Sequence, residues 1–499
     1  MRLHMDGNRA LKRAWLGGAL LLLLAGPAWT QAGNSEPQLP RQASAPVAGM
    51  QSQSVGQAGT SGGNPFLGSV PQGAATGDEL PLSLADAVVR GLRYNLGTLL
   101  ADQGTRAARG ARFMALSGLL PNIGTTIRES SQQANLAAFG FPGLPGIAPI
   151  IGPFGLSDAR GYVSQSILDF PSIQGTRAAS QEVKAAEYAS RDAQDVVVLV
   201  VTNLYLQAVA GASRAEATRA QVATAEASYK QAVDFKQNGV VPAIDVLRAQ
   251  VELHAQQQRL IFFRNEFDKQ KLGLARAIGL PDGQPLRLTD ALPFAPLPPL
   301  TLEEAMSRAL GARRDYQSAL ASVSAAELTR KAAQAERLPS LQFDGNYGII
   351  GPTLTNSHGT YTAAVSLNIP IFQGERVHGR ILESDALLEQ RRAQLADLKG
   401  RIAFEVRTAF LDLNAAGEQV QVARGNVDLA QQQLTQARDR FTAGVTNNLE
   451  VIQAQEAVAT ANENYISSLY SYNSAKAALG RAVGGSEKTI PSFLQGVMP

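Results

Sequence analysis

The sequence predicts a mainly α-helical protein with membrane β-strands, in which one unit of long antiparallel coiled helices and two strands occurs twice. The duplication is direct, because residues 239–279 align without a gap onto residues 444–484. Two helix-like segments, 175–238 and 374–443, would each be roughly 90 Å long, which exceeds the thickness of a globular core. Between the helix-like segments, apolar and polar residues alternate as they do in strands.

The N-terminal segment predicts export. Residues 1–32 combine basic side chains, an apolar run at 14–26 and small residues ending at Ala32, which is the pattern of a signal peptide. The apolar run is shorter than the ~20 residues that a membrane-spanning helix needs, and we expect no comparable run later in the chain. Residues 33–80 are rich in Gly, Pro, Ser and Gln, and this composition predicts a flexible linker.

The remaining chain divides into two repeats with short segments after each. The predicted boundaries are 81–280 for the first repeat, 281–299 for a Pro-rich linker, 300–485 for the second repeat and 486–499 for a C-terminal tail. Each repeat opens with one helix-like segment, at 82–118 and 300–337, and a proline follows each of them. The helix and its proline are therefore duplicated together.

Two strands are predicted in each repeat. Residues 341–349 and 361–369 alternate between apolar and polar side chains over about nine to eleven residues, which is the length of a membrane strand. The first copy alternates less regularly, at Ile123, Thr125 and Ile127 and then at Tyr162, Leu168 and Phe170, each set expected on one face of its strand. Between these strands lies the apolar Gly/Pro-rich segment 136–155, which we expect in neither helix nor ladder. It is either a disordered tip or an exposed loop that touches a partner or lipid.

A long helical hairpin is predicted to end each repeat. Gly239 and Gly444 suit the left-handed position that closes a helix, and return helices follow to about Ile278 and Val483. Where strand gives way to helix, a proline ends the ladder and a glycine permits a bend. The predicted strand–helix hinges are Pro171, Gly175, Pro370 and Gly374.

Composition excludes several functions. The net charge is only +3 and no basic run with interleaved aromatic residues occurs, so nucleic acid is not an expected partner. The absence of Cys excludes disulfides, thiolate metal sites and a lipidated N-terminal Cys. The 4 His are scattered, and neither a Ser/His/Asp set nor a phosphate-binding loop is recognisable. We therefore expect no enzyme activity, no metal and no cofactor.

Four strands cannot close a barrel of useful diameter, yet an open sheet edge is not tolerated in lipid. If the strands lie in a membrane, several protomers must contribute to one barrel. The same assembly would set the helical hairpins side by side around an axis and form a conduit.

The duplicated segments resemble the TolC-like outer-membrane efflux family over about residues 80–485. The resemblance is carried by "LSLADAV", "FPSIQG", "IPIFQGER", "NGVVPAIDVLRAQ" and "AGVTNNLEVIQAQ", in this order. It implies a homotrimer with a twelve-stranded β-barrel in the outer membrane and an α-helical barrel in the periplasm. Such a protein is the exit duct of a tripartite efflux pump or type I secretion system. Its implied partners are outer-membrane lipid, a periplasmic adaptor and an inner-membrane pump or ATP-driven exporter.

The resemblance places the hairpin turns at the periplasmic entrance. The implied turn and adaptor-docking residues are Gly239, Val240, Pro242, Gly444, Val445 and Asn447, and the gate candidates are Asp245, Arg248, Phe441, Thr446, Glu450 and Gln453. Three protomers would present six carboxylates there, which favours cations. Alternatively, Asp245 and Glu450 only stabilise the helix starts, and Asn447 with Glu450 has the spacing of a capping box.

This chain departs from the family pattern at its gate. Phe441, Thr446 and Gln453 stand where a familiar member of the family has a Tyr, an Arg and an acidic residue. Phe441 lacks a hydroxyl and Thr446 lacks a cationic group, so we expect a gate held by packing and fewer charge-assisted hydrogen bonds. An alternative to a channel is a periplasmic or surface coiled-coil scaffold without a pore. The sequence does not specify the cargo.

Overall fold

The computed structural model describes residues 64–140, 146, 148–297 and 300–495. The predicted signal peptide 1–32 lies outside the described residues, as do residues 33–63 of the predicted linker and the last residues of the tail. Residues 64–80 are ordered by contacts with the first repeat, since Val70 N–H donates to the Tyr94 carbonyl at 3.0 Å and Phe66 packs against the main core. The predicted flexible linker is therefore structured near its end.

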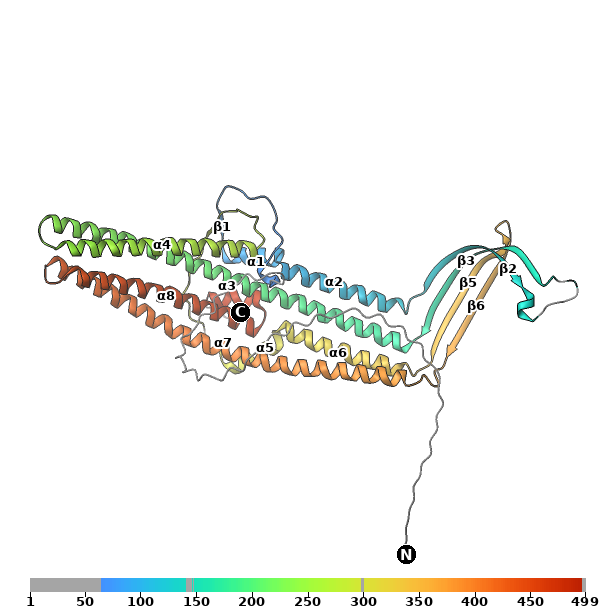
Figure 1. Ribbon diagram of the computed structural model, residues 1–499. Coiled ribbons are helices and arrows are strands. Elements are labelled where there is room, and N and C mark those ends of the chain that lie inside the picture. The colour runs from blue at the N-terminus through green and yellow to red at the C-terminus, as the bar shows by residue number, and fades with distance from the viewer. Residues whose placement is uncertain (1–63, 141–145, 147, 298–299, 496–499) are drawn as a thin grey trace, which may run out of the picture. The chain divides into compact units, whose positions relative to one another are not determined.

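Long helices dominate the described chain, and a four-stranded sheet joins the two repeats (Figure 1). A second sheet consists of two short parallel strands, Leu80–Leu82 and Leu286–Leu288. The first repeat contains η1 (Pro65–Leu67), β1 (Leu80–Leu82), α1 (Leu84–Tyr94), α2 (Leu96–Ser117), β2 (Asn122–Asn135), η2 (Leu136–Phe139), β3 (Ile150–Leu168), α3 (Phe170–Gln237) and α4 (Ala243–Ala277). The second contains α5 (Leu302–Ala312), α6 (Arg314–Ala335), β5 (Ser340–Thr353), β6 (Asn356–Asn368), α7 (Arg376–Thr442) and α8 (Asn448–Val483). β4 (Leu286–Leu288) lies in the linker between the repeats, and α9 (Ser486–Leu494) lies in the C-terminal tail. Thus the predicted order of helix, strand pair and hairpin is present twice.

The first predicted helix of each repeat is broken in two. Asn95 is fully buried and adopts an extended backbone conformation, its side chain accepting a hydrogen bond from Gly97 N–H and donating to the carbonyls of Phe66 and Ala277. Arg313 interrupts the second helix in the same way and is also buried. The predicted continuous helices 82–118 and 300–337 were wrong, because polar contacts distant in sequence stabilise these two residues outside the helix.

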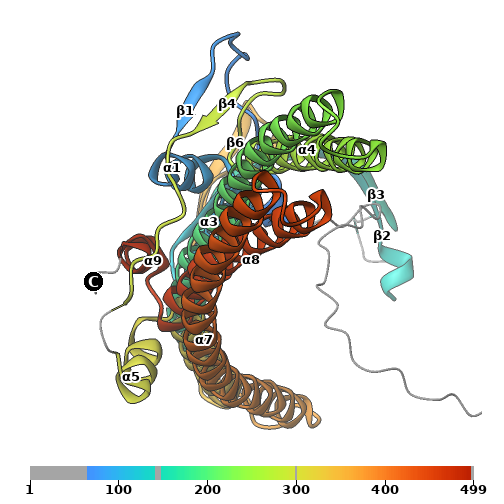
Figure 2. The same cartoon turned by 90° about the vertical axis from the view of Figure 1, so that its left-hand side faces the viewer.

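The two hairpins, α3–α4 and α7–α8, follow one another along an arc, with α1, α5 and α9 on its convex side (Figure 2). The main core lies where α1 meets α3, around Val197, Val201 and Tyr205. Helix α3 includes an 18-residue window apolar enough to cross a membrane by composition, and 56% of that window is buried in the protein. The expectation of no later apolar run was wrong, and this run builds the core.

Strands β2, β3, β5 and β6 form one antiparallel sheet in the order β2-β3-β5-β6, so β2 and β6 are its edges. The strands have 14, 19, 14 and 13 residues, which is longer than predicted. Tyr347 pairs with Tyr361 on a face that also carries Ile123, while Thr362 pairs with Asn346 on the opposite, polar face. Tyr347, Tyr361 and Ile123 are each at least 76% exposed. This sheet therefore exposes an apolar surface.

Two details of the first strand pair differ from prediction. Residues 150–155 belong to β3 and pair with β2, although the segment 136–155 was expected outside any ladder. A register shift between Gln132 and Ala134 accommodates Pro153 at this point. A second irregularity between Ser166 and Leu168 places Tyr162 and Leu168 on opposite faces, so they do not share a face as predicted.

Candidate functional site

Both hairpin turns close with the same backbone motif. Gly239 and Gly444 have φ values of 72° and 69° and lie one residue past the caps of α3 and α7. Val240 N–H donates to the Phe235 carbonyl at 2.8 Å, and Val445 N–H donates to the Arg440 carbonyl at 3.0 Å. These are Schellman caps, which satisfy the last carbonyls of each helix. Both valines project into solvent, with 63% and 69% of their surface exposed.

The two turns lie against each other through packing and one buried hydrogen bond. The rings of Phe235 and Phe441 are tilted by 40° with centroids 5.7 Å apart, and they join an apolar cluster from α7 and α8. Asn448 Nδ2 donates to the backbone carbonyl of Asp245 at 3.3 Å. Asn448 and Asp245 expose 1% and 3% of their surface. The hairpin ends are thus joined within one protomer.

The carboxylate of Asp245 lies inside the protomer. Its Oδ1 accepts a hydrogen bond from Arg248 Nη1 at 3.2 Å, one turn later in α4. Asp245 is in the first turn of α4, where a negative charge is stabilised by the helix dipole. Arg248 is exposed and Pro242 precedes the helix as its N-cap residue. Asp245 is accordingly shielded from solvent by its own protomer.

Glu450 has a different environment from Asp245. Its Oε2 accepts a hydrogen bond from Thr446 Oγ1 at 2.5 Å, and its Oε1 lies 3.4 Å from Arg440 Nη1. Asn447 caps α8 by accepting from Leu449 N–H at 3.1 Å. The predicted capping-box spacing of Asn447 and Glu450 is not used as a box, because Glu450 turns to Thr446 and Arg440. The Glu450 side chain remains 37% exposed.

Additional polar contacts join the hairpins farther from the turns. Arg259 on α4 forms two hydrogen bonds with Glu456 on α8, at 3.1 and 2.5 Å. Gln455 Nε2 donates to Ser228 Oγ on α3 at 2.7 Å. The sequence analysis missed these residues and Asn448, because partners about 200 residues apart give no periodic signal. Gln453, a predicted gate residue, is exposed on α8.

The strand–helix junctions differ between the two repeats. Pro171 lies in the first turn of α3, which Asp169 caps by accepting from Ser172 N–H at 3.2 Å. Gly175 lies inside α3 rather than at the junction, so α3 begins earlier than the predicted 175. In the second repeat Pro370 precedes α7, and Gly374 and Glu375 both have positive φ values, 57° and 62°. The chain therefore bends through left-handed residues only at the second of these two junctions.

Away from the turns, Lys476 is a fully buried cation on α8. Its Nζ donates to the carbonyls of Ala295 and Leu494 and lies 5.1 Å from the ring centroid of Tyr472. Asn473 Nδ2 donates to the Pro293 carbonyl at 2.8 Å. Burial lowers the pKa of Lys476 to about 8. These contacts attach the inter-repeat linker and α9 to α8.

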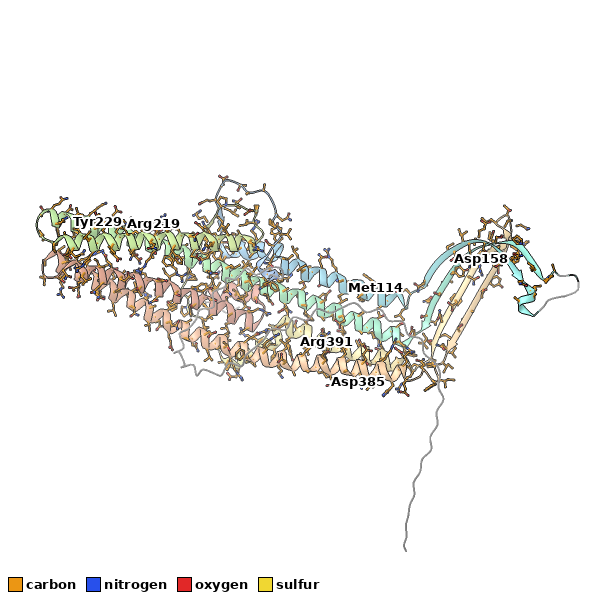
Figure 3. The ribbon with its side chains drawn as sticks, viewed as in Figure 1. Met114, Asp158, Arg219, Tyr229, Asp385 and Arg391 are labelled. Atoms are coloured by element: carbon orange, nitrogen blue, oxygen red, sulfur yellow. The ribbon has the colours of Figure 1, made fainter. Side chains whose placement is uncertain are left out.

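No cluster of three or more His, Asp or Glu side chains that could hold a metal ion occurs among the residues that the structure describes. Figure 3 shows Asp158 in the sheet and Tyr229 and Arg219 on α3 toward the hairpin turns. The strand layer and the hairpin turns are thus opposite ends of the long helices.

Comparison with known proteins shows similarity over both repeats. The model of the outer membrane efflux protein family matches residues 101–280 and 305–485. The chain is 27% identical over 399 residues to the probable efflux pump outer membrane protein SepC of Pseudomonas putida, covering 77% of this chain and 80% of SepC. It is 22% identical over 344 residues to the alkaline protease secretion protein AprF of Pseudomonas aeruginosa, covering 64% and 69%. The solved Campylobacter jejuni CmeC outer membrane channel has the same fold, with a TM-score of 0.69 at 16% identity over 89% of this chain and 98% of that chain.

Proposed function

Because the chain belongs to the outer membrane efflux protein family, we propose that it is the exit duct of a tripartite efflux pump or a type I secretion system. Small molecules or polypeptides would pass through its helical tunnel and its barrel to the exterior. SepC is named for efflux and AprF for secretion of a protease, and both classes of cargo fit this proposal. The protein would act as a channel and carry out no catalysis.

The open sheet is the observation that carries the proposal. Its edge strands β2 and β6 leave their outer backbone groups without ladder partners within the described chain. In lipid such groups must be paired, so β2 of one protomer would pair with β6 of the next. Three protomers would close twelve strands, with the face of Tyr347 and Tyr361 toward lipid and the face of Thr362 toward the lumen. The proposed homotrimer is compatible with this pairing.

The long helices carry exposed apolar rows that the same neighbours would cover. On α4 the row comprises Leu247, Val251, Ile261, Phe262 and Leu272, and on α7 it comprises Phe404, Leu411, Val422 and Leu429. Removal of these apolar side chains from water at a contact between protomers would favour association. Since α4 and α7 lie in different hairpins, head-to-tail contact between the two rows would close a ring.

The entrance would lie at the hairpin turns. We assign Asp245, Arg248, Phe441, Thr446, Glu450 and Gln453 to the gate, with Phe441 acting by packing and Glu450 by its exposed charge. A periplasmic adaptor would dock on the exposed turns, which consist of Gly239, Val240, Pro242, Gly444, Val445 and Asn447. The adaptor would connect the duct to an inner-membrane pump or ATP-driven exporter.

The N-terminal segment fits a location in the outer membrane. Residues 1–32 would direct export as a signal peptide, and the absence of Cys in the chain leaves no thiol for lipidation. The junctions at Pro171 in the first repeat and at Pro370 and Gly374 in the second would connect barrel to tunnel, with the left-handed bend confined to the second repeat.

Planar-bilayer recording of the purified protein tests the function. We expect discrete conductance steps from a species whose mass in detergent, measured by light scattering, corresponds to three chains. The protein should also require detergent for extraction from the outer-membrane fraction. A water-soluble species without conductance would instead support the pore-free coiled-coil scaffold.

A further inference from the structure

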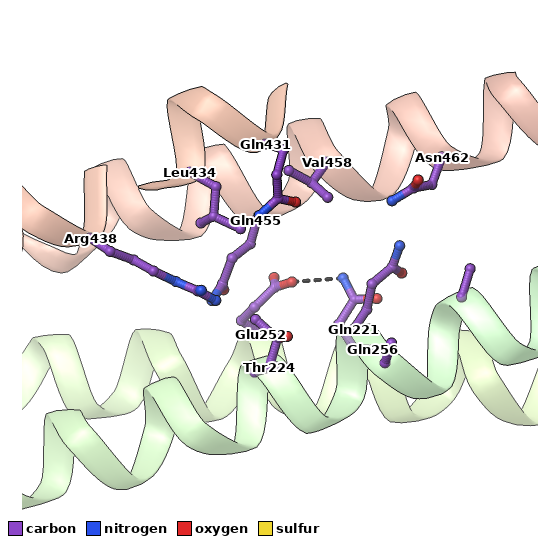
Figure 4. Close-up of a pocket in the computed structure, with 13 residues that line it drawn as sticks. Gln221, Thr224, Glu252, Gln256, Gln431, Leu434, Arg438, Gln455, Val458 and Asn462 are labelled. Carbon is purple, nitrogen blue, oxygen red and sulfur yellow. Dashed lines mark hydrogen bonds between the residues drawn. The ribbon is translucent and has the colours of Figure 1, made fainter. Parts of the chain in front are cut away.

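A polar cavity lies between the two hairpins, in the part of the helices near the turns (Figure 4). Its volume is about 310 Å³, and its walls come from α3, α4, α7 and α8. At 1.5 Å per residue, Glu252 on α4 lies roughly 10–15 Å along the helix from the turn. The cavity therefore lies farther along the helices than Asp245 and Glu450, the acidic residues at the helix starts.

Two buried side chains in this cavity have an acceptor without a partner. Gln256 is 2% exposed and Gln455 is 8% exposed. Neither Oε1 atom has a hydrogen-bond partner within the part of the chain that the structure describes. Gln256 Nε2 donates to Glu252 Oε1 at 2.7 Å. Because a carboxylate only accepts, this bond orients the Gln256 amide and leaves its oxygen as the free atom.

The charges of the cavity are balanced. Glu252 supplies a carboxylate on one wall and Arg438 a guanidinium on another, and amides of Gln221, Gln431 and Asn462 surround them. Figure 4 shows the Gln455 side chain extending from α8 toward Glu252 and the end of Arg438. A buried acceptor without a hydrogen-bond partner raises the free energy of the folded protein. A ligand that donates hydrogen bonds to these oxygens would remove this penalty.

We propose that this cavity binds a small zwitterion of the amino-acid class. Its primary ammonium group has three donors, which match the carboxylate of Glu252 and the free oxygens of Gln256 and Gln455. Its carboxylate would accept the paired N–H groups of Arg438. The volume exceeds the 30 Å³ of one water about tenfold, so a molecule of this class fits. A bound zwitterion contacts both hairpins and ties them together. The binding itself does not depend on the protein being a channel.

Saturation-transfer NMR and calorimetric titration of the detergent-solubilised protein test the site, with glycine as the probe. Glycine betaine is the matched control, because it keeps both charges and lacks every N–H donor. We expect saturation transfer to glycine and little to betaine. Glu252→Gln and Arg438→Gln should each weaken glycine binding about 10- to 100-fold, as the loss of a charge-assisted hydrogen bond does.

Two more variants separate binding from folding. Gln455→Leu removes one of the three acceptors and should reduce the preference for glycine over betaine, whereas Gln257→Leu, on the exposed face of the same α4 helix as Glu252, should not change it. Melting temperatures of all variants check that they remain folded. Equal signals for glycine and betaine, insensitivity to Glu252→Gln, or a crystal structure in glycine with only water in the cavity would overturn the proposal.

Discussion

Asn448 Nδ2 donates to the backbone carbonyl of Asp245 at 3.3 Å, and this hydrogen bond joins the first turns of α4 and α8 in the interior of the protein. The two residues come from different repeats, and Asn448 corresponds to Ala243, two positions before Asp245 in the duplicated turn. Their contact makes the end of one hairpin depend on the end of the other. In the proposed trimer, six such helix ends would surround the entrance.

Replacement of Asn448 by Ala should loosen this contact. The buried carbonyl of Asp245 would lose its hydrogen-bond donor, which should lower the free energy of unfolding by about 1–3 kcal/mol. We expect a higher single-channel conductance in planar bilayers, because the hairpin ends separate more easily. The control is Asn426→Ala, which removes the same amide from the exposed surface of α7. Equal conductance of Asn448→Ala and the wild type would show that this bond does not restrain the entrance.

Glu450→Gln should lower the preference of the channel for cations over anions. The Glu450 carboxylate is partly exposed, so its charge reaches the proposed mouth. Asp245→Asn should change selectivity less, because Asp245 is buried and paired with Arg248. Reversal potentials in asymmetric salt measure both effects. If Glu450→Gln changes neither conductance nor selectivity, Glu450 has no part in an entrance ring.

Tyr361→Arg and Thr362→Arg should have opposite outcomes, although the residues are adjacent in β6. Tyr361 pairs with Tyr347 on the apolar face, where an arginine in lipid costs about 2–4 kcal/mol. Thr362 lies on the polar face, where the same side chain would remain hydrated. We expect Tyr361→Arg to reduce the amount of protein in the outer-membrane fraction and Thr362→Arg to leave it unchanged. Equal amounts would mean that this face does not contact lipid.

Lys476 should make stability depend on alkaline pH. Its pKa falls from 10.5 to about 8 on burial. Between these values the unfolded chain binds the proton that the folded protein lacks, so the free energy of unfolding rises as pH rises from about 8 to 10.5. The contribution is on the order of 3 kcal/mol and is lost as pH falls through about 8.

Scanning calorimetry of Lys476→Met over this pH range checks the prediction. The variant should lose most of the rise in melting temperature between pH 8 and 10.5. The control is Lys331→Met, at an exposed position of α6, which should keep the wild-type pH dependence. An unchanged rise in Lys476→Met would assign the effect to other groups.

The family match and the fold confirm the predicted resemblance and its repeated helix, strand and hairpin order. Local patterns carried these predictions. Gly239 and Gly444 adopt left-handed conformations at the turns. A residue with a side chain would be strained there, so the glycine itself indicates the turn in the sequence. The alternation at 341–349 likewise follows from the strand geometry alone.

The prediction of an unbroken first helix was wrong for a reason that lies outside the local sequence. Asn95 breaks its helix because it bonds to Phe66 and Ala277, which lie in other segments. The sequence also does not reveal that the backbone carbonyl of the buried Asp245 accepts a hydrogen bond from Asn448 of the other repeat.

The sequence by itself determined the duplication, the strand and helix order and the place of the two turns, since each depends on periodicity or on the conformational preference of single residues. Only the tertiary structure decided which polar groups are paired between the hairpins and which acceptors are left free in the cavity. Those pairings depend on the register of helices from different repeats, as between Gln455 and Ser228, and that register is set by packing over the whole length of the helices.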